Sequence, residues 1–206
     1  MKQQPAHKSI QSGLTLVETI IIISLFAILS LAVAESIASF YSVNAYTIAQ
    51  SYQVNHARQG IESLVRDLRE MTLGDDGTFP LAIMDPNEVG FYSDIDKDNS
   101  VEYVEYEVST TTLEKRIYNA TGSPPVYNFG VPDQTIILSE YVQNILQGTS
   151  TFLYYDQNGL LATPTSTVTD IKYIGVKLIV NIDPVRDPGE FTLRSSAALR
   201  NLKESQ

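Results

Sequence analysis

The chain has 206 residues, of which 43% are hydrophobic and 18% are charged, and its formal net charge is −10. This length is sufficient for one domain of ordinary size and a membrane anchor. An acidic surface repels the phosphates of nucleic acids, so we predict no nucleic-acid partner. The absence of cysteine excludes disulfides, thiolate metal sites and a cysteine nucleophile.

The chain begins with a polar leader, residues 1–13, which carries Lys2 and Lys8 and no acid. Positive charge beside an apolar segment favours the cytoplasmic side of a membrane. Residues 14–34 follow, and Glu18 is their only charged residue. At about 1.5 Å per residue, this segment is long enough as a helix to cross the hydrocarbon layer. We therefore predict a transmembrane helix over residues 14–34.

The predicted helix continues beyond this span. No glycine or proline interrupts the chain between Leu14 and Gly60, and we expect the helix to extend to Leu73. In its second half, residues 35–73, apolar side chains recur every three or four residues, which is typical of a face that packs against a sheet. These side chains are Ile61, Leu64, Val65, Leu68 and Met71. The charged side chains between them are expected to form a solvated face, and they are Arg58, Glu62, Arg66, Asp67, Arg69 and Glu70.

The segment LGDDG at residues 73–77, followed by Pro80, ends the predicted helix, and the pattern then changes to a period of two. The tract VEYVEYEVS alternates apolar and acidic side chains, as a half-buried strand does. Later strands are predicted in TTTLEKRIYN, STFLYYD, DIKYIGVKLIVNID and GEFTLRSSAALRNL, whereas TIILSEYVQNI fits either a strand or a short helix. Strands joined by short turns after one leading helix predict an α+β fold. In this fold the long N-terminal helix packs on an antiparallel sheet in a roll, with a β-rich globular region at residues 74–206.

The sequence GLTLVE at residues 13–18, followed by a long apolar run, resembles the signal of type IV prepilins and type II secretion pseudopilins. In that family a prepilin peptidase cuts after the glycine and methylates the new N-terminal amine. The resemblance therefore implies cleavage between Gly13 and Leu14. It also implies a single-pass inner-membrane protein with an exported C-terminal domain, which later enters a filament at the cell surface or in the periplasm.

Several later segments, among them ARQGIESLVRDLREM, FLYYD and FTLRSSAALRNL, are similar to large minor pilins and to the J-type minor pseudopilin. The implied partners are other pilin or pseudopilin subunits, the prepilin peptidase, the inner-membrane assembly platform, and membrane lipid before extraction. Glu35 stands where the family has a helix-loosening proline, and no cysteine is present for a C-terminal disulfide loop. These departures favour a minor subunit that primes or caps assembly. Whether it serves a surface pilus or a type II secretion system stays open.

Glu18 is a costly residue inside an apolar span. By the same resemblance, cleavage gives Leu14 a positive α-amine about one helical turn from Glu18. We hypothesise that Glu18 of one subunit meets that amine on a neighbouring subunit, since pairing offsets the burial of both charges. The alternative is a lone glutamate that reaches toward the membrane surface from an ordinary signal anchor.

The stretch DIDKDNSVEYVE offers a candidate calcium site. Asp94, Asp96, Asp98 and Glu105 occupy positions 1, 3, 5 and 12 of a calcium loop. The predicted strand carries Glu105 about 13 Å away, at about 3.3 Å per residue, which favours a plain acidic hairpin turn. A shallow site formed by Asp94, Asp96, Asp98 and Glu102 is the alternative reading, and no other cofactor is predicted.

The sequence does not predict an enzyme. His7 lies in the leader, and His56 stands without a diagnostic serine or acid pattern around it. The alternative from another functional class is a monomeric, membrane-anchored binding domain, with or without calcium as a ligand.

Overall fold

The protein is described by a computed structural model that covers residues 15–162, 166–186 and 189–199. It divides into two compact units, one ending at Tyr46 and the other beginning at Thr47. Helix α1, Leu16–Arg69, begins in the first unit and continues into the second, which also holds the strands β1 to β10 of the described residues. We call the second unit the head. The predicted α+β fold, with a long N-terminal helix and antiparallel sheets, is confirmed.

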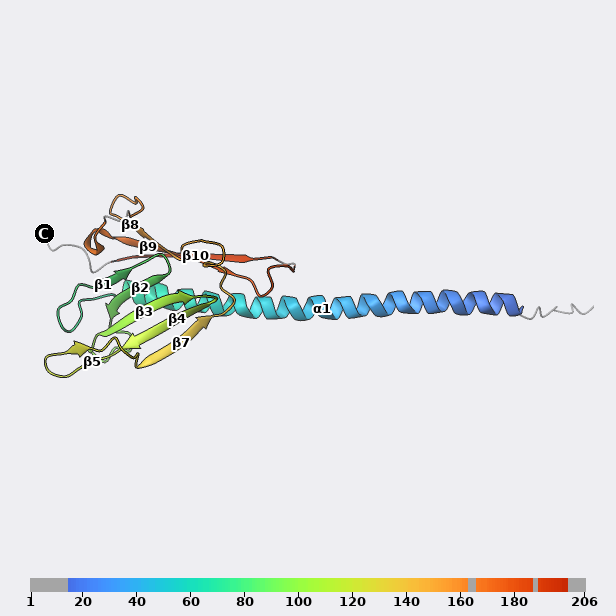
Figure 1. The fold of residues 1–206 in the computed structure, drawn as a ribbon, viewed down its shortest axis with the longest axis horizontal. Coiled ribbons are helices and arrows are strands. Elements are labelled where there is room, and N and C mark those ends of the chain that lie inside the picture. Colours follow the sequence, from blue (N-terminus) through green and yellow to red (C-terminus); the bar gives the residue numbers. More distant parts are fainter. Residues whose placement is uncertain (1–14, 163–165, 187–188, 200–206) are drawn as a thin grey trace, which may run out of the picture. The chain divides into compact units, whose positions relative to one another are not determined.

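The described residues of the head form three antiparallel sheets. The five-stranded sheet has the order β1-β2-β3-β4-β7, and its strands are Leu81–Met84, Glu88–Ser93, Glu102–Ser109, Thr112–Tyr118 and Gln134–Ser139. The three-stranded sheet has the order β10-β9-β8, with strands Phe191–Ala198, Tyr173–Val180 and Phe152–Tyr155, and Figure 1 shows these three grouped apart from the larger sheet. The smallest sheet joins β5, Ala120–Thr121, to β6, Val126–Tyr127, and a short 3-10 helix, η1, spans Val168–Asp170.

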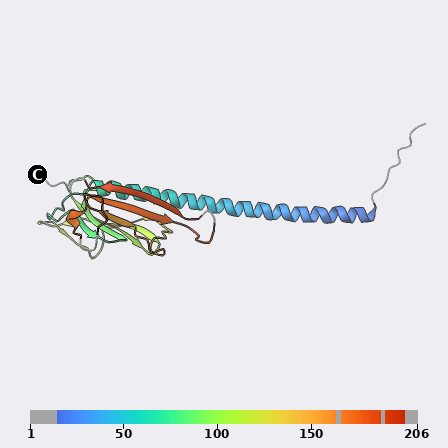
Figure 2. The same cartoon turned by 90° about the horizontal axis from the view of Figure 1, so that it is seen from above.

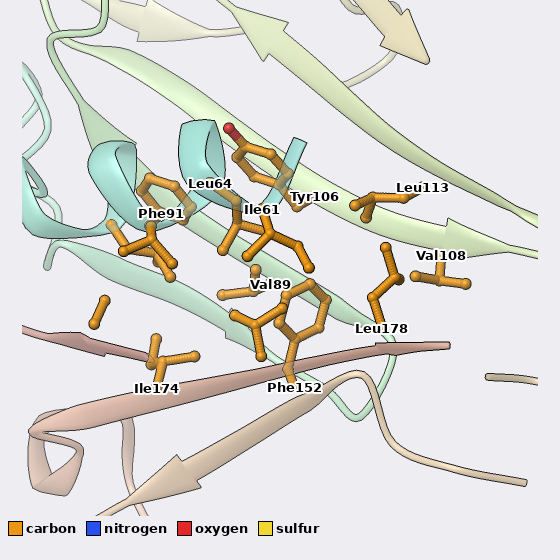
Figure 3. Packing of buried hydrophobic residues seen from close by; sticks show 14 of the residues in the cluster. Ile61, Leu64, Val89, Phe91, Tyr106, Val108, Leu113, Phe152, Ile174 and Leu178 are labelled. Carbon is orange, nitrogen blue, oxygen red and sulfur yellow. The ribbon is translucent and has the colours of Figure 1, made fainter. Parts of the chain in front are cut away.

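The main core lies between the head part of α1 and the inner faces of the two larger sheets. Figure 3 shows Ile61 and Leu64 of α1 in one cluster with Phe91 of the larger sheet and with Ile174 and Phe152 of the smaller sheet. The predicted stripe on α1 is buried in this core, together with the alternating apolar residues of β3 and β9. The period of 3.6 in the helix and the period of two in the strands thus converge on one core.

The sequence predicts that the helix extends to Leu73, but helix α1 ends at Arg69. Met71 leaves the helix to form an antiparallel bridge with Ser93, and its side chain is buried. The N–H of the next residue donates a hydrogen bond of 2.9 Å to the carbonyl of Tyr92. The helix therefore ends early because the sheet supplies partners for the backbone that follows it.

The prediction that Asp67 lies on a solvated face is wrong. Asp67 is only 3% exposed, and its Oδ2 lies 2.6 Å from the Nζ of Lys115 on β4. The hydroxyl of Tyr106 on β3 donates a second hydrogen bond, 2.7 Å long, to the same oxygen. The cause is a tertiary partner, since Lys115 points into the core from the inner face of the sheet. The other charged residues in the predicted set, from Arg58 to Glu70, are exposed.

The fold also resolves the structure of TIILSEYVQNI and the position of β9 and β10 relative to the head part of α1. The ambiguous stretch TIILSEYVQNI contains strand β7 and no helix among its residues. Figure 2 shows β9 and β10 lying alongside α1 in the head, and Arg69 Nη2 donates to the carbonyl oxygen of Ser196 on β10 at 3.4 Å. The helix thus contacts both larger sheets.

Candidate functional site

The first candidate is the N-terminal part of α1, where every residue from 15 to 45 is exposed. From Thr19 to Ala34 this surface carries no charge. Among the described residues, α1 is the helix that is long and apolar enough to cross a membrane. An apolar helix in the core of a water-soluble protein is mostly buried, whereas the most apolar part of this helix has no burial within the chain. The structure therefore has an N-terminal segment that fits a single membrane span.

Several hydroxyl groups of this segment satisfy their hydrogen bonds within the helix. Ser24 Oγ donates to the carbonyl of Ile21 at 2.9 Å, and Ser36 Oγ donates to the carbonyl of Ala32 at 2.8 Å. Thr19 Oγ1 makes equivalent bonds one turn back along the helix. Internal bonds of this kind remove the need for water, as a hydrocarbon environment demands.

The helix start gives Glu18 a local role that the sequence interpretation missed. The N–H of Glu18 donates to Thr15 Oγ1 at 3.3 Å, and the N–H of Thr19 donates to the Thr15 carbonyl at 3.1 Å. Thr15 therefore caps the helix, and its spacing to Glu18 is that of a capping box. A carboxylate in the first turn also complements the helix dipole. The signal was present in the sequence as Thr15-Leu16-Val17-Glu18.

The other residues predicted for processing, Gly13 and Leu14, lie outside the described residues. The Glu18 side chain is exposed, and it has no ion-pair partner within the part of the chain that the structure describes. The helix start therefore presents a charged group that the described residues do not neutralise.

The second candidate is the acidic turn between β2 and β3. One carboxylate oxygen from each of Asp94, Asp96 and Glu102 lies within 4.8 Å of the others. Asp98 does not belong to this group, and its Oδ1 accepts a hydrogen bond of 2.7 Å from the N–H of Ser100. The structure thus brings together three of the four residues predicted for the shallow site.

The same three carboxylates hold the turn together. Asp94 Oδ1 accepts the N–H of Lys97 at 2.7 Å, and Glu102 Oε2 accepts the N–H of Ile95 at 3.0 Å. Lys97 and Asn99 both have a left-handed backbone, with φ of 63° and 72°. Such bonds within a loop are ordinary turn chemistry.

The surroundings of the turn change the pKa of the Glu102 carboxyl. Burial raises the pKa of its carboxyl above the ordinary value, and the negative charges of Asp96, Asp98 and Asp94 act in the same direction. Glu105, by contrast, lies on β3, where its Oε1 is 2.7 Å from Arg116 Nη1. Glu105 is therefore engaged by the sheet, and the twelve-residue calcium loop does not form.

His56 is exposed on α1, and its ring centroid lies 4.3 Å from that of Tyr52. These two rings line a groove of about 250 Å³ beside residues 137–140 of the larger sheet. The groove holds Glu140 as its one carboxylate among the lining residues. Ser139 also lines the groove, but its Oγ donates to the carbonyl oxygen of Glu140 at 3.3 Å, and no hydrogen bond joins His56 to Ser139 or Glu140 among the described residues.

A scan against models of protein families finds none that matches this chain, and a search of curated proteins also finds no match. The observed architecture, one long N-terminal apolar helix packed on an antiparallel sheet, resembles the pilin-like fold.

Proposed function

We propose that this chain is a minor pilin or pseudopilin, a structural subunit of a type IV pilus-like filament. It is inserted as a single membrane span, cut between Gly13 and Leu14, and assembled through its N-terminal helix. The observation that carries the proposal is the exposed apolar segment of α1, which opens with Glu18 and is continuous with the helix that organises the head. A helix of this kind needs an apolar partner outside the chain, first lipid and then other helices.

The proposed role of Glu18 is to set the register between neighbouring helices. After cleavage, the α-amine of Leu14 and the carboxylate of Glu18 lie in the same apolar layer. An unpaired charge there is expensive, and pairing between neighbours offsets that expense only when the subunits have the correct axial offset. The absence of an ion-pair partner for Glu18 in the described part of the chain supports this role.

The proposed place of this subunit is at or near the filament tip, in few copies. Glu35 is exposed on α1 and begins the segment beyond the proposed span. In a filament built from this subunit alone, that carboxylate would recur in every copy within a crowded core of helices. A subunit used only to prime or cap assembly avoids that repeated repulsion.

The proposal is tested first by the mature N-terminus of the membrane-bound protein. Mass spectrometry is expected to find a chain that begins at a methylated Leu14. Retention of the intact leader from Met1 in cells with an active prepilin peptidase would contradict the proposal. Quantitative proteomics of purified filaments then tests copy number, and abundance above every other pilin-like component would contradict the minor role.

Glu18 variants separate the proposed register role from helix capping. Glu18→Gln keeps the length and the capping ability of the side chain but removes its charge, whereas Glu18→Asp keeps the charge. If pairing with the amine matters, Glu18→Gln chains are processed but do not enter filaments, and the Glu18→Asp variant retains part of the incorporation. Equal incorporation of Glu18→Gln and the wild-type chain would leave capping as the sufficient explanation.

A further inference from the structure

The two larger sheets of the head carry opposite charge on their outer faces. On the five-stranded sheet, Glu88, Glu107 and Glu114 are directly opposed across β2, β3 and β4, so they form one row of like charge. Their neighbours along the strands, such as Val89 and Val108, point into the core, and the row therefore faces outward. Like charges directly opposite one another in a sheet are destabilising.

One arginine partly compensates this row. Arg116 Nη2 lies 2.6 Å from Glu107 Oε2 and 3.4 Å from Glu114 Oε2. Arg116 Nη1 also contacts Glu105, which leaves Glu88 without an ion pair among the described residues. We call this surface, formed by Glu88, Glu105, Glu107, Glu114 and Arg116, the acidic face. With four carboxylates against one guanidinium, it keeps an excess of negative charge.

The three-stranded sheet has the reverse arrangement. Lys177 on β9 is directly opposed to Arg194 on β10. Val176 and Leu178, the two neighbours of Lys177 along β9, are buried in the core, so Lys177 and Arg194 lie on the outer face of the sheet. Neither cation has an ion-pair partner within the described part of the chain. Arg69 adds a third cation beside Ser196 at the edge of this sheet. We call the surface of Lys177, Arg194 and Arg69 the basic face.

We propose that the basic face of one copy of this chain docks on the acidic face of a second copy. Each face bears like charges that are poorly compensated in its own chain, and the other face supplies the missing opposite charges. Adjacent strands are about 4.8 Å apart in both sheets, so charges on neighbouring strands of one sheet match the spacing on the other. The inference rests on the proposed function only in assuming that a few copies meet in one assembly.

The contact uses two different surfaces and is therefore heterologous. A heterologous contact leaves one face of each kind unused at the ends, so a third copy can add in the same way. The contact also has to overcome the general repulsion between chains of net charge −10. Its strength therefore depends on local pairing and falls as salt screens the charges.

Single cysteines make the contact measurable, since the chain has no cysteine of its own. Thr135, opposite Arg116 in the larger sheet, reports on the acidic face, and Ser196 reports on the basic face. One full-length variant carries Thr135→Cys, another carries Ser196→Cys, and the two are mixed in detergent micelles and oxidised. The expected product is a disulfide between the two variants, with little product from either variant alone.

Charge reversal identifies the cause of the contact. Lys177→Glu with Arg194→Glu in the Ser196→Cys copy is expected to lower the crosslinked fraction about tenfold or more. Glu107→Lys with Glu114→Lys in the Thr135→Cys copy is expected to restore the crosslink, because the two faces are then complementary again. Lys97→Glu reverses one cation outside both faces and controls for half of this change in net charge, and it is expected to leave the crosslink unchanged.

The outcomes separate this inference from the proposed function. A crosslink that ignores both charge reversal and salt, or one that joins the Thr135→Cys variant only to another copy of itself, would overturn the inference. If the variant with the two introduced lysines does not fold by circular dichroism, the salt dependence of the crosslink between the two single-cysteine variants decides in its place. Loss of crosslinking alone leaves processing at Gly13 untouched, whereas an unprocessed chain can still crosslink through its head.

Discussion

Helix α1 is one element with two kinds of surface. Its first part, up to residue 45, exposes every described side chain, while its head part buries Ala57, Ile61, Leu64, Val65 and Leu68. Both parts contain aliphatic residues in plenty, so hydrophobic content alone does not separate them. The arrangement does, because apolar residues surround the first part and form one stripe on the second. The comparison shows that an apolar face on one side of a helix packs against the sheets of the same chain, whereas a helix that is apolar on all sides requires apolar surroundings outside the chain.

Charged residues follow the same division. In the first part, Glu18 and Glu35 are exposed, and neither residue forms an ion pair within the described part of the chain. In the head part, Asp67 is buried and contacts Lys115 and Tyr106. A buried carboxylate is tolerated where the fold provides its partners. Mutations in the two parts should therefore have very different effects on the stability of the head.

The largest effect is expected from Asp67→Ala. This change leaves Lys115 buried at 8% side-chain exposure without its 2.6 Å partner. Breaking a buried pair in this way costs about 3–5 kcal/mol in the free energy of unfolding. Denaturant unfolding of the full chain in detergent, followed by near-ultraviolet circular dichroism, measures the loss.

The matched control for this prediction removes both charges. Asp67→Leu combined with Lys115→Met replaces the pair by apolar side chains, and it is expected to be far less harmful than Asp67→Ala. A loss below about 1 kcal/mol for Asp67→Ala alone, the range of an exposed pair, would contradict the buried position.

The next effect compares leucines in the two parts of the helix. Leu64 has 0% exposure in the core, and Leu64→Ala is expected to cost the head about 2–5 kcal/mol. Leu25 is 56% exposed, and Leu25→Ala should change head stability by no more than about 0.5 kcal/mol. Equal losses on denaturant unfolding would mean that the first part of the helix also belongs to the folded core.

Much of the fold follows from local patterns in the sequence. The stripe from Ile61 to Met71 and the alternation in VEYVEYEVS were sufficient to predict a helix on an antiparallel sheet. Each pattern is a repeat within one element, and its period identifies the buried face directly. The separation of Glu105 from the acidic turn was predicted in the same way, since a strand fixes the direction of its side chains.

The features that could not be predicted depend on residues far apart in the chain. The partner of Asp67 lies 48 positions away, and nothing in the helical pattern distinguishes Asp67 from its exposed neighbours. The end of α1 depends on Ser93, which draws Met71 into a bridge. Asp98 does not join the acidic cluster of Asp94, Asp96 and Glu102, and this depends on the geometry of the loop, which no local sequence pattern predicts. The roles of Gly13, Leu14 and Glu18 in processing and assembly stay predictions.

A smaller effect is expected where α1 approaches β7. A Cβ atom added at Gly60 would lie 3.0 Å from the Cβ of Leu138 and 3.4 Å from its carbonyl oxygen. Alanine in a helix normally gains about 1 kcal/mol over glycine. Leu138 itself has no register partner on β4, but its neighbours Ile137 and Ser139 pair with Glu114 and Leu113. Because this pairing limits how far Leu138 can move, the clash should exceed this gain, so that Gly60→Ala destabilises the head by about 1 kcal/mol.

Two controls sharpen this prediction. Gln59→Ala changes an exposed neighbour and should be nearly neutral. Leu138→Ala creates room, so Gly60→Ala should be better tolerated in that background than in the wild-type chain. A stabilising Gly60→Ala in the wild-type chain would show that the sheet can move away from the helix.

The smallest effect concerns pH, and it separates a carboxylate of the head from one in the first part of the helix. Burial raises the pKa of Glu88, and the nearby charges of Glu105, Glu107 and Asp85 act in the same direction. The folded head therefore holds the Glu88 proton more tightly than the unfolded chain, whose glutamates titrate near about pH 4.3. The stability from this tighter binding is fully present below the unfolded pKa and is lost as the pH rises through the folded pKa.

Glu88→Gln mimics the protonated form, and it should stabilise the head by about a few tenths of a kcal/mol at neutral pH. Unfolding measured against pH should show this gain disappearing below about pH 4. Glu18→Gln changes a residue outside the head and should leave the stability of the head at neutral pH unchanged, and a gain equal to that of Glu88→Gln would contradict the contrast between the head and the first part of α1.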